Sequence, residues 1–172
     1  GLGDVYKRQS QEGAVYLEVG VYAGSTFCAA VQNNDMVAAY ANDNWSQPNL
    51  QPGREDLNLT LENVTVDTFV KNLQENISTE TLDFDIQVLN GDSSKLGKKD
   101  FKHDVNVIFY DGDNSEQKMR EFFLNMIDFT EDVFTLVIDD ANIEENVAIT
   151  KRFIDAMGFK VLFERELLND PE

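Results

Sequence analysis

Short apolar runs alternate along this chain with segments that have the periodicity of helices. Between the runs, apolar residues recur every three or four positions in 66–77, 116–127 and 143–157, as on one face of a helix. A further helix-compatible stretch, 26–32, follows the first run. The alternation predicts an α/β fold in which helices cover both faces of a mostly parallel sheet. The runs have the length of strands buried on both faces, and they are 14–19, 36–41, 84–89, 105–110, 133–138 and 160–164.

One polar segment, 42–63, interrupts the alternation after the second run. It contains Pro48, Pro52 and Gly53, which are residues typical of loops. We expect a long loop or lid beside the functional site, because long loops in compact domains are usually functional.

The first apolar run passes into its helix through a turn that contains two glycines. Residues 16–26 read Y-L-E-V-G-V-Y-A-G-S-T, with Glu18 ahead of Gly20 and Gly24. Glycines at such a turn bring bare backbone close to a ligand at the carboxyl edge of a sheet. The spacing differs from the G-x-G-x-x-G of dinucleotide binders, and an acid ahead of it suits a ligand with a cationic end. The arrangement resembles the first motif of class I methyltransferases, which bind S-adenosylmethionine; a turn without a ligand is the alternative.

Acidic residues also follow the later strand runs. Asp43, Asp92, Asp111 and Asp139 come after the second, third, fourth and fifth runs. The carboxyl ends of parallel strands share one edge of a sheet, so these side chains are expected to converge there with Glu18. A single aspartate in such a place is most often a turn former or a helix N-cap, but the recurrence after successive strands indicates a common site.

Each acid has a use if the ligand is S-adenosylmethionine. Glu18 is predicted to help hold the methionine ammonium group. Asp43 follows Gly20 by roughly twenty residues, which suits an acceptor of hydrogen bonds from ribose hydroxyls. Asp92 is predicted to accept a hydrogen bond from the adenine amino group, and its neighbour Ser93 is counted with it among the cofactor-binding residues. A crevice lined with acids favours the sulfonium cation over its neutral product.

Two sequences, F-Y-D-G-D-N-S at 109–115 and L-V-I-D-D-A-N at 136–142, place Asp111, Asp139 and Asp140 just beyond strands. If these strands are neighbours, the three carboxylates repel one another and have raised pKa values unless a cation neutralises them. All-oxygen ligands select a hard ion, with Mg²⁺ first and Mn²⁺ or Ca²⁺ next. The alternative is that Asp139 and Asp140 cap the helix that follows.

From about residue 14 to residue 168 the chain resembles the class I methyltransferases. Within them it is similar to small-molecule O-methyltransferases with a D-G-D-H-S-Y-like motif after the fourth strand, such as the catechol-type and macrolide-sugar enzymes. The resemblance implies a Rossmann-like sheet of seven strands, a donor crevice over strands one to four, and a divalent ion that orients a substrate hydroxyl. In related enzymes the ion is held at positions that match Asp111, Asp139 and Asp140.

The chain departs from that pattern at two places. Asn114 stands where the family has a histidine, and no lysine lies between Asp111 and Gln117, so Asp113, together with Asp111, is the candidate catalytic base. The chain also stops just after the sixth run, so the seventh strand is expected to be missing. We therefore expect 10–172 to be a single methyltransferase-like domain that is truncated at its C-terminus.

Composition limits the partners and the cellular location that we expect for this domain. The chain has 32 acidic and 14 basic side chains and a net charge of −18, which disfavours nucleic acid as a partner because phosphate binding needs clustered Lys and Arg. No apolar run approaches the length of a membrane span and no signal peptide is visible, so we expect a soluble cytoplasmic domain that does not bind membranes. Residues 1–9 resemble a translated sequencing adapter, as in a metagenomic fragment, and are set aside.

The leading prediction is an S-adenosylmethionine-dependent methyltransferase that transfers a methyl group in line to the hydroxyl of a small molecule or sugar, with Mg²⁺ assistance and a homodimer left open. A non-catalytic S-adenosylmethionine-binding or protein-interaction domain is the alternative that Asn114 keeps open. A nicotinamide-dependent oxidoreductase is disfavoured, because the chain has no G-x-G-x-x-G and no Arg or Lys near the glycine turn.

Overall fold

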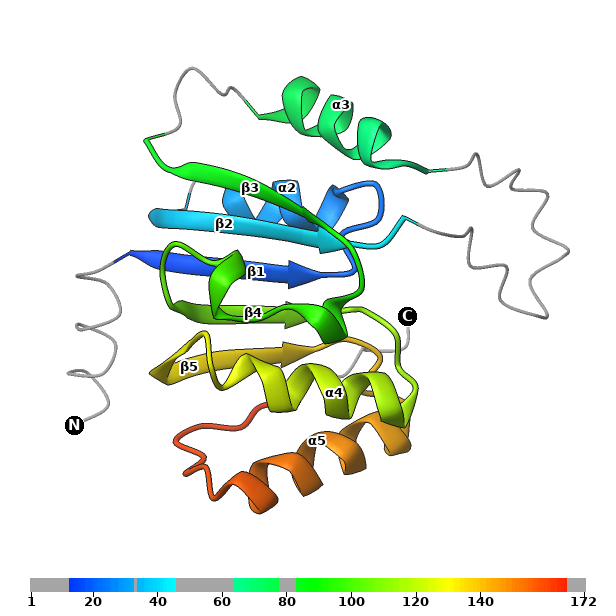
Figure 1. Ribbon diagram of the computed structural model, residues 1–172, viewed down its shortest axis with the longest axis vertical. Helices are drawn as coiled ribbons and strands as arrows, with labels where there is room; N and C mark the ends of the chain where they lie inside the picture. Colours follow the sequence, from blue (N-terminus) through cyan, green and yellow to red (C-terminus); the bar gives the residue numbers. More distant parts are fainter. Residues whose placement is uncertain (1–12, 33, 46–63, 78–82, 167–172) are drawn as a thin grey trace, which may run out of the picture.

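A computed structural model describes residues 13–32, 34–45, 64–77 and 83–166 of the chain (Figure 1). Two 3-10 turns, η2 (Ser93–Lys95) and η3 (Lys98–Asp100), precede the fourth strand. The helices of these ranges are α2 (Ser25–Val31), α3 (Val66–Asn76), α4 (Glu116–Met126) and α5 (Glu144–Met157). The strands are β1 (Ala14–Val19), β2 (Met36–Asp43), β3 (Asp85–Asn90), β4 (Val105–Tyr110) and β5 (Thr130–Ile138).

The strands form one parallel sheet in the order β3-β2-β1-β4-β5. The chain builds outward from β1 to β3 and then crosses to the other side of β1 to begin β4 (Figure 1). The strand order therefore reverses between β1 and β4, and in open α/β sheets ligands bind at such a switch point, beyond the carboxyl ends of the strands. The predicted α/β fold with a parallel sheet is confirmed.

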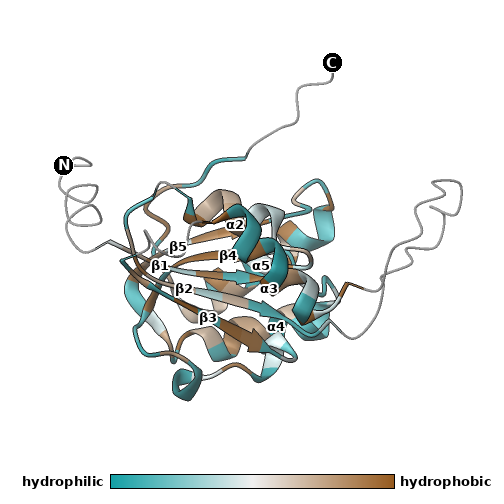
Figure 2. Cartoon of the chain, turned by 90° about the horizontal axis from the view of Figure 1, so that it is seen from above, coloured by the Kyte–Doolittle hydropathy of each residue, from teal (hydrophilic) through white to brown (hydrophobic). Residues whose placement is uncertain are grey.

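Side chains that alternate along the strands build a separate core on each face of the sheet. Val15 and Leu17 of β1 face the same core as Phe122 of α4 and Phe153 of α5. Tyr16, between them, faces the other core, which α2 and α3 cover. Seen from above in Figure 2, the strands are largely apolar and helices lie on both sides of them. Burial of both faces explains why the strands read as continuous apolar runs.

The prediction of a sixth strand at 160–164 is wrong. Residues 159–166 have no strand structure, and β5 is the last strand on its side of the sheet in the described part of the chain. A strand needs a neighbour that accepts its main-chain hydrogen bonds, and the apolar pattern alone does not supply one. The segment is held instead by the ring of Phe159 against Phe134, with centroids 5.5 Å apart, and by a Lys151–Glu164 ion pair of 3.0 Å.

The remaining predicted elements are present with small shifts of their ends. β2 continues two residues beyond the predicted run, so Asp43 is its last residue, and β5 begins at Thr130 rather than at Val133. Of the predicted loop at 42–63, residues 46–63 lie outside the described residues, as does the segment 1–9. No helix in the described ranges is long and apolar enough to cross a membrane.

Candidate functional site

The turn between β1 and α2 lies pressed between the ends of β2 and β4. Gly20 has a φ of +88°, and a Cβ built on it would collide with the main-chain carbonyl of Asp111. The Gly20 amide donates to the Asn42 carbonyl at 2.8 Å, and the Asp111 amide donates to the Val19 carbonyl at 2.8 Å. The chain therefore requires glycine at position 20 for its own packing, in addition to any approach of a ligand.

Gly24 closes the same turn in front of α2. Its φ is +92°, and a Cβ at this position would lie 2.8 Å from the ring of Phe69, a fully buried residue of α3. Few side chains adopt a left-handed backbone readily, and here the space is also taken. Contacts within the chain therefore require glycine at both predicted positions, and Gly24 is the residue directly before α2.

Glu18 lies beneath the turn and has no exposed surface. Its carboxylate accepts hydrogen bonds from the Tyr16 hydroxyl at 2.6 Å and from the Thr26 hydroxyl. Burial raises the pKa of Glu18, while these two hydrogen bonds oppose the rise. The carboxylate thus ties β1 to the first turn of α2. The predicted contact of Glu18 with a ligand ammonium stays a prediction.

Asp43 lies at the carboxyl end of β2, beside the turn. Its two carboxylate oxygens accept the main-chain amides of Tyr22 at 2.8 Å and Trp45 at 2.9 Å. A carboxylate oxygen has two acceptor positions, so each oxygen retains one for a ligand hydroxyl. The structure therefore leaves Asp43 able to take its predicted role while it also shapes the loop around it.

Asp92 follows β3 and is engaged with α4. One carboxylate oxygen accepts from the Lys118 ammonium at 2.5 Å, and the other accepts from the amide and hydroxyl of Ser94 at 2.9 and 2.7 Å. The hydrogen bond from Lys118 is the largest cause that lowers the pKa of Asp92, to about 2. Asp92 is therefore ionised. It is also the N-cap of η2, whose first residue is Ser93, the neighbour predicted with it to bind the cofactor.

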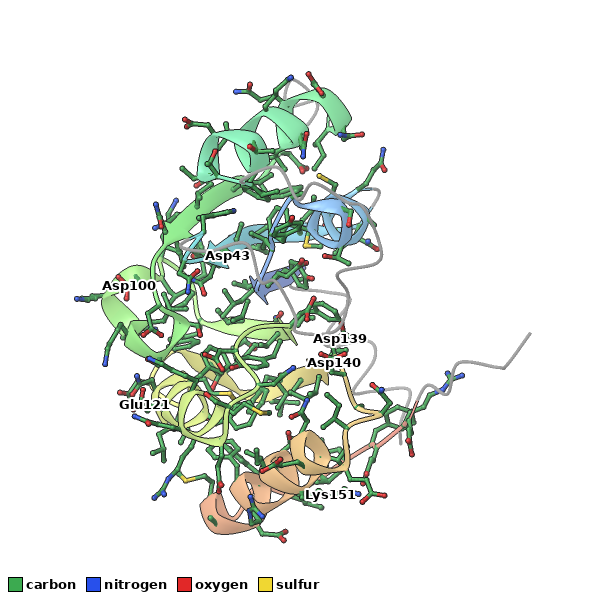
Figure 3. All side chains as sticks on the ribbon, turned by 90° about the vertical axis from the view of Figure 1, so that its right-hand side faces the viewer. Asp43, Asp100, Glu121, Asp139, Asp140 and Lys151 are labelled. Carbon is green, nitrogen blue, oxygen red and sulfur yellow. The ribbon has the colours of Figure 1, made fainter. Side chains whose placement is uncertain are left out.

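The loops after β4 and β5 bring Asp111, Asp139 and Asp140 together, as their positions predicted. Figure 3 looks onto the carboxyl ends of the strands, with Asp139 and Asp140 side by side and Asp43 across the edge from them. Burial, with the nearby negative charges of Asp139 and Asp140, raises the pKa of Asp111 to about 7. The side-chain amide of Asn114 donates to Asp140 at 3.0 Å, so Asn114 links the two loops.

The same carboxylates do not fit a metal site in this arrangement. Within the described ranges, no group of three or more His, Cys, Asp or Glu side chains is arranged to hold an ion. Asp111, Asp139 and Asp140 are close enough to affect one another electrostatically, but they are not arranged to coordinate one ion. The Mg²⁺ prediction is therefore not supported. Asp113, the other candidate base, is exposed, and its carboxylate accepts the Ser115 amide at 2.9 Å just ahead of α4.

Several residues at the site escaped the sequence analysis. The alternation of a strand places Tyr16 on the same face as Glu18, which was a readable signal. A weaker signal was the hydroxyl of Thr26 in the first turn of α2. The pairing of Lys118 with Asp92 had no signal in the sequence, because α4 meets η2 only in the folded chain.

The strand order and the labelled aspartates in Figure 3 define a doubly wound α/β domain with acidic side chains at the carboxyl ends of its strands. No protein-family model matches the chain, and no curated protein matches it. Among solved structures it is similar to a candidate RNA methyltransferase from Pyrococcus horikoshii, at 16% identity and a TM-score of 0.48, over 91% of this chain and 62% of that chain.

A second similar structure is a candidate S-adenosyl-L-methionine-dependent methyltransferase from Methanococcus maripaludis. The identity is 13% and the TM-score 0.43, over 90% of this chain and 61% of that chain. The present chain thus spans less than two thirds of the length of either structure. Likenesses as distant as these do not assign an activity to it.

Proposed function

We propose that this domain is an S-adenosylmethionine-dependent methyltransferase that acts on a hydroxyl group of a small molecule or sugar. The observation that carries the proposal is the convergence, at the switch point of a parallel sheet, of the glycine turn at Gly20 with Asp43 and Asp111. Open α/β sheets bind nucleotide-containing ligands at this point. A carboxylate at the end of the second strand suits the ribose of such a ligand.

The charge of the crevice supports a cationic donor over a dinucleotide. A dinucleotide carries a pyrophosphate, and Asp43, Asp111 and Asp139 would repel its negative charge. S-adenosylmethionine carries a sulfonium and an ammonium group, and both are attracted to the same carboxylates. The turn also lacks the glycine spacing and basic side chains that hold a pyrophosphate.

When bound, S-adenosylmethionine supplies an electrophilic methyl group, whose bond to sulfur breaks as its bond to the acceptor oxygen forms. The chain must then hold the acceptor in line and take up the proton of its hydroxyl. Asp111 fits the second task better than Asp113, because its pKa of about 7 lies near neutral pH and because it lies among Glu18, Asp139 and Asp140 at the switch point. Asp113 is exposed and caps the turn before α4.

The strong negative charge supports a small acceptor over a nucleic acid. With a net charge of −18 the chain repels a polyanion, whereas it does not repel a neutral sugar or phenol. A non-catalytic binding domain is the second candidate. It is favoured by Asn114, which bonds to Asp140 where the resembling enzymes have a histidine.

Calorimetric titration of the purified protein with S-adenosylmethionine and with NAD⁺ tests the ligand. We expect binding of the first only, and Asp43→Ala should weaken it by about 1–3 kcal/mol through loss of charge-assisted hydrogen bonds. Asp100→Ala is the matched control, because Asp100 likewise accepts a main-chain amide, from Gly97 at 2.9 Å, but belongs to η3, ahead of β4. Equal binding by both variants would contradict the assignment of the crevice.

A methyl-transfer assay with labelled donor then separates an enzyme from a binding domain. The acceptor panel includes sugars, phenols and an RNA. Transfer to a sugar or phenol supports the proposal, and Asp111→Asn should lower the rate much more than Asp113→Asn. Transfer to RNA alone, or binding without transfer to any acceptor, would contradict the proposed reaction.

A further inference from the structure

Two large residues, one inside the glycine turn and one next to it, have a backbone conformation that large residues rarely adopt. Tyr22 has a φ of +47° and Trp45 a φ of +42°, both in the left-handed region. Such a conformation is strained for a large side chain and persists only where surrounding contacts hold it. Tyr22 is 44% exposed, so burial of its side chain does not supply that hold.

The contacts that hold the pair come from Asp43 and from the pair itself. Asp43 accepts both main-chain amides, and the indole N–H of Trp45 donates to the main-chain carbonyl of Tyr22 at 2.9 Å. The main-chain N–H and the main-chain carbonyl of Tyr22 are therefore both hydrogen-bonded. We call the set of Tyr22, Asp43 and Trp45 the clasp.

The clasp is anchored on the domain through the ring of Trp45. This ring packs on Phe69 with centroids 5.7 Å apart, and Phe69 in turn lies against Gly24 at the far end of the glycine turn. The turn is thus held at Gly20 by the main chain of Asp111, in its middle by the clasp, and at Gly24 by Phe69. Side-chain hydrogen bonds hold the turn in its middle, through the clasp, and at Ala23, whose carbonyl accepts the side-chain amide of Asn72 in α3 at 3.0 Å.

We infer that Trp45 is a positioning residue for the donor site, an inference that rests on the proposed function. Its indole N–H keeps Tyr22 in the left-handed conformation and so orients the peptide groups of the turn toward the crevice. Without that bond Tyr22 relaxes toward a negative φ, which rotates those peptide groups away from their places. The role of Trp45 is therefore exerted through the main chain of the turn.

Trp45→Phe tests the role with a minimal change. Phenylalanine keeps a ring for Phe69 and removes only the N–H group. The control is Tyr40→Phe in β2, the strand that ends two residues before Trp45, which removes a buried hydroxyl that accepts the amides of Lys102 at 3.0 Å and His103 at 3.2 Å, ahead of β4.

By calorimetry, Trp45→Phe should raise the Kd for S-adenosylmethionine about five-fold, the value of one net hydrogen bond. Tyr40→Phe should leave the Kd unchanged while lowering the melting temperature at least as much. A purely structural role for Trp45 predicts that Kd follows melting temperature in both variants. Wild-type affinity in Trp45→Phe would overturn the inference.

A second measurement needs no ligand and separates failure of the clasp from failure of the proposed function. Trp45 is the only tryptophan of the chain, so its fluorescence reports on the clasp alone. Asp43→Asn replaces one acceptor oxygen by an NH₂ group, which cannot accept an amide, and should shift the emission to longer wavelength as the indole meets water. Unchanged emission would overturn the clasp. An emission shift in Asp43→Asn together with no binding of S-adenosylmethionine by the wild type would overturn the proposed function and, with it, the donor-site role of Trp45.

Discussion

The main-chain carbonyl of Asp111 occupies the space that a side chain on residue 20 would need. An ideal Cβ on Gly20 would lie 2.6 Å from the carbonyl carbon of Asp111, well inside any real Cβ contact. The residues that directly follow the first and fourth strands therefore meet through bare backbone. This contact brings the glycine turn and the acidic loop after β4 to one place.

Gly20→Ala should destabilise the fold by about 2–5 kcal/mol, since it adds left-handed strain to a collision with main chain. The midpoint of denaturant unfolding measures the loss. Gly97→Ala is the control, because Gly97 has an extended φ of −156° and nothing within 4 Å of its Cβ position. Equal midpoints for the two variants would show that the strands do not meet in this way.

Thr26→Val should destabilise the protein by about 1–3 kcal/mol, because the buried carboxylate of Glu18 loses a donor. The same substitution at Thr150 is the control. The Thr150 hydroxyl donates to the Asn146 carbonyl within helix α5, at 2.9 Å, and its loss should cost no more than about 0.5 kcal/mol. Similar losses at both sites, measured by urea unfolding, would mean that Glu18 does not depend on Thr26.

The raised pKa of Asp111 predicts a pH dependence of stability. In the unfolded chain this carboxyl ionises near its ordinary pKa of 3.8, whereas in the folded chain it ionises near 7. Between these values the folded state holds the extra proton, so the free energy of unfolding falls as pH rises through the interval. The full cost is present above pH 7.

Asp111→Asn removes that cost because the amide stays neutral. The variant should be more stable than the wild type above pH 7, and its advantage should disappear as pH falls toward 4. Urea unfolding of both proteins across this range gives the difference, in which the other titrating groups cancel. A difference that does not vary with pH would contradict the raised pKa.

The predicted metal role of Asp111, Asp139 and Asp140 remains to be tested with an added ion. An ion shared by the three carboxylates would offset their repulsion and stabilise the folded state by mass action. On this prediction, millimolar Mg²⁺ raises the melting temperature of the wild type, excess chelator reverses the rise, and Asp139→Asn abolishes it. Identical melting with Mg²⁺ and with chelator would remove the metal from the site.

The strands and helices were largely readable from the sequence because their signal is local. β1 and β4 have the predicted bounds, and α3 and α4 end one residue earlier than predicted. The exception is 160–164, where Val161, Leu162 and Phe163 read as a buried strand but are 51%, 55% and 71% exposed. An apolar run indicates a preference for the strand conformation, but a strand forms only if another strand lies beside it.

The site divides in the same way between local and tertiary information. By itself the sequence determined that acids follow successive strands and that glycines end the first, which was enough to place Asp43, Asp111, Asp139 and Asp140 at one edge. Only the tertiary structure decided what each group contacts. It buries Glu18 beneath the turn, commits Asp92 to Lys118, and brings the main chain of Asp111 against Gly20. The physical reason is that hydrogen-bond partners and burial depend on residues far apart in the chain, and these meet only once the sheet has assembled.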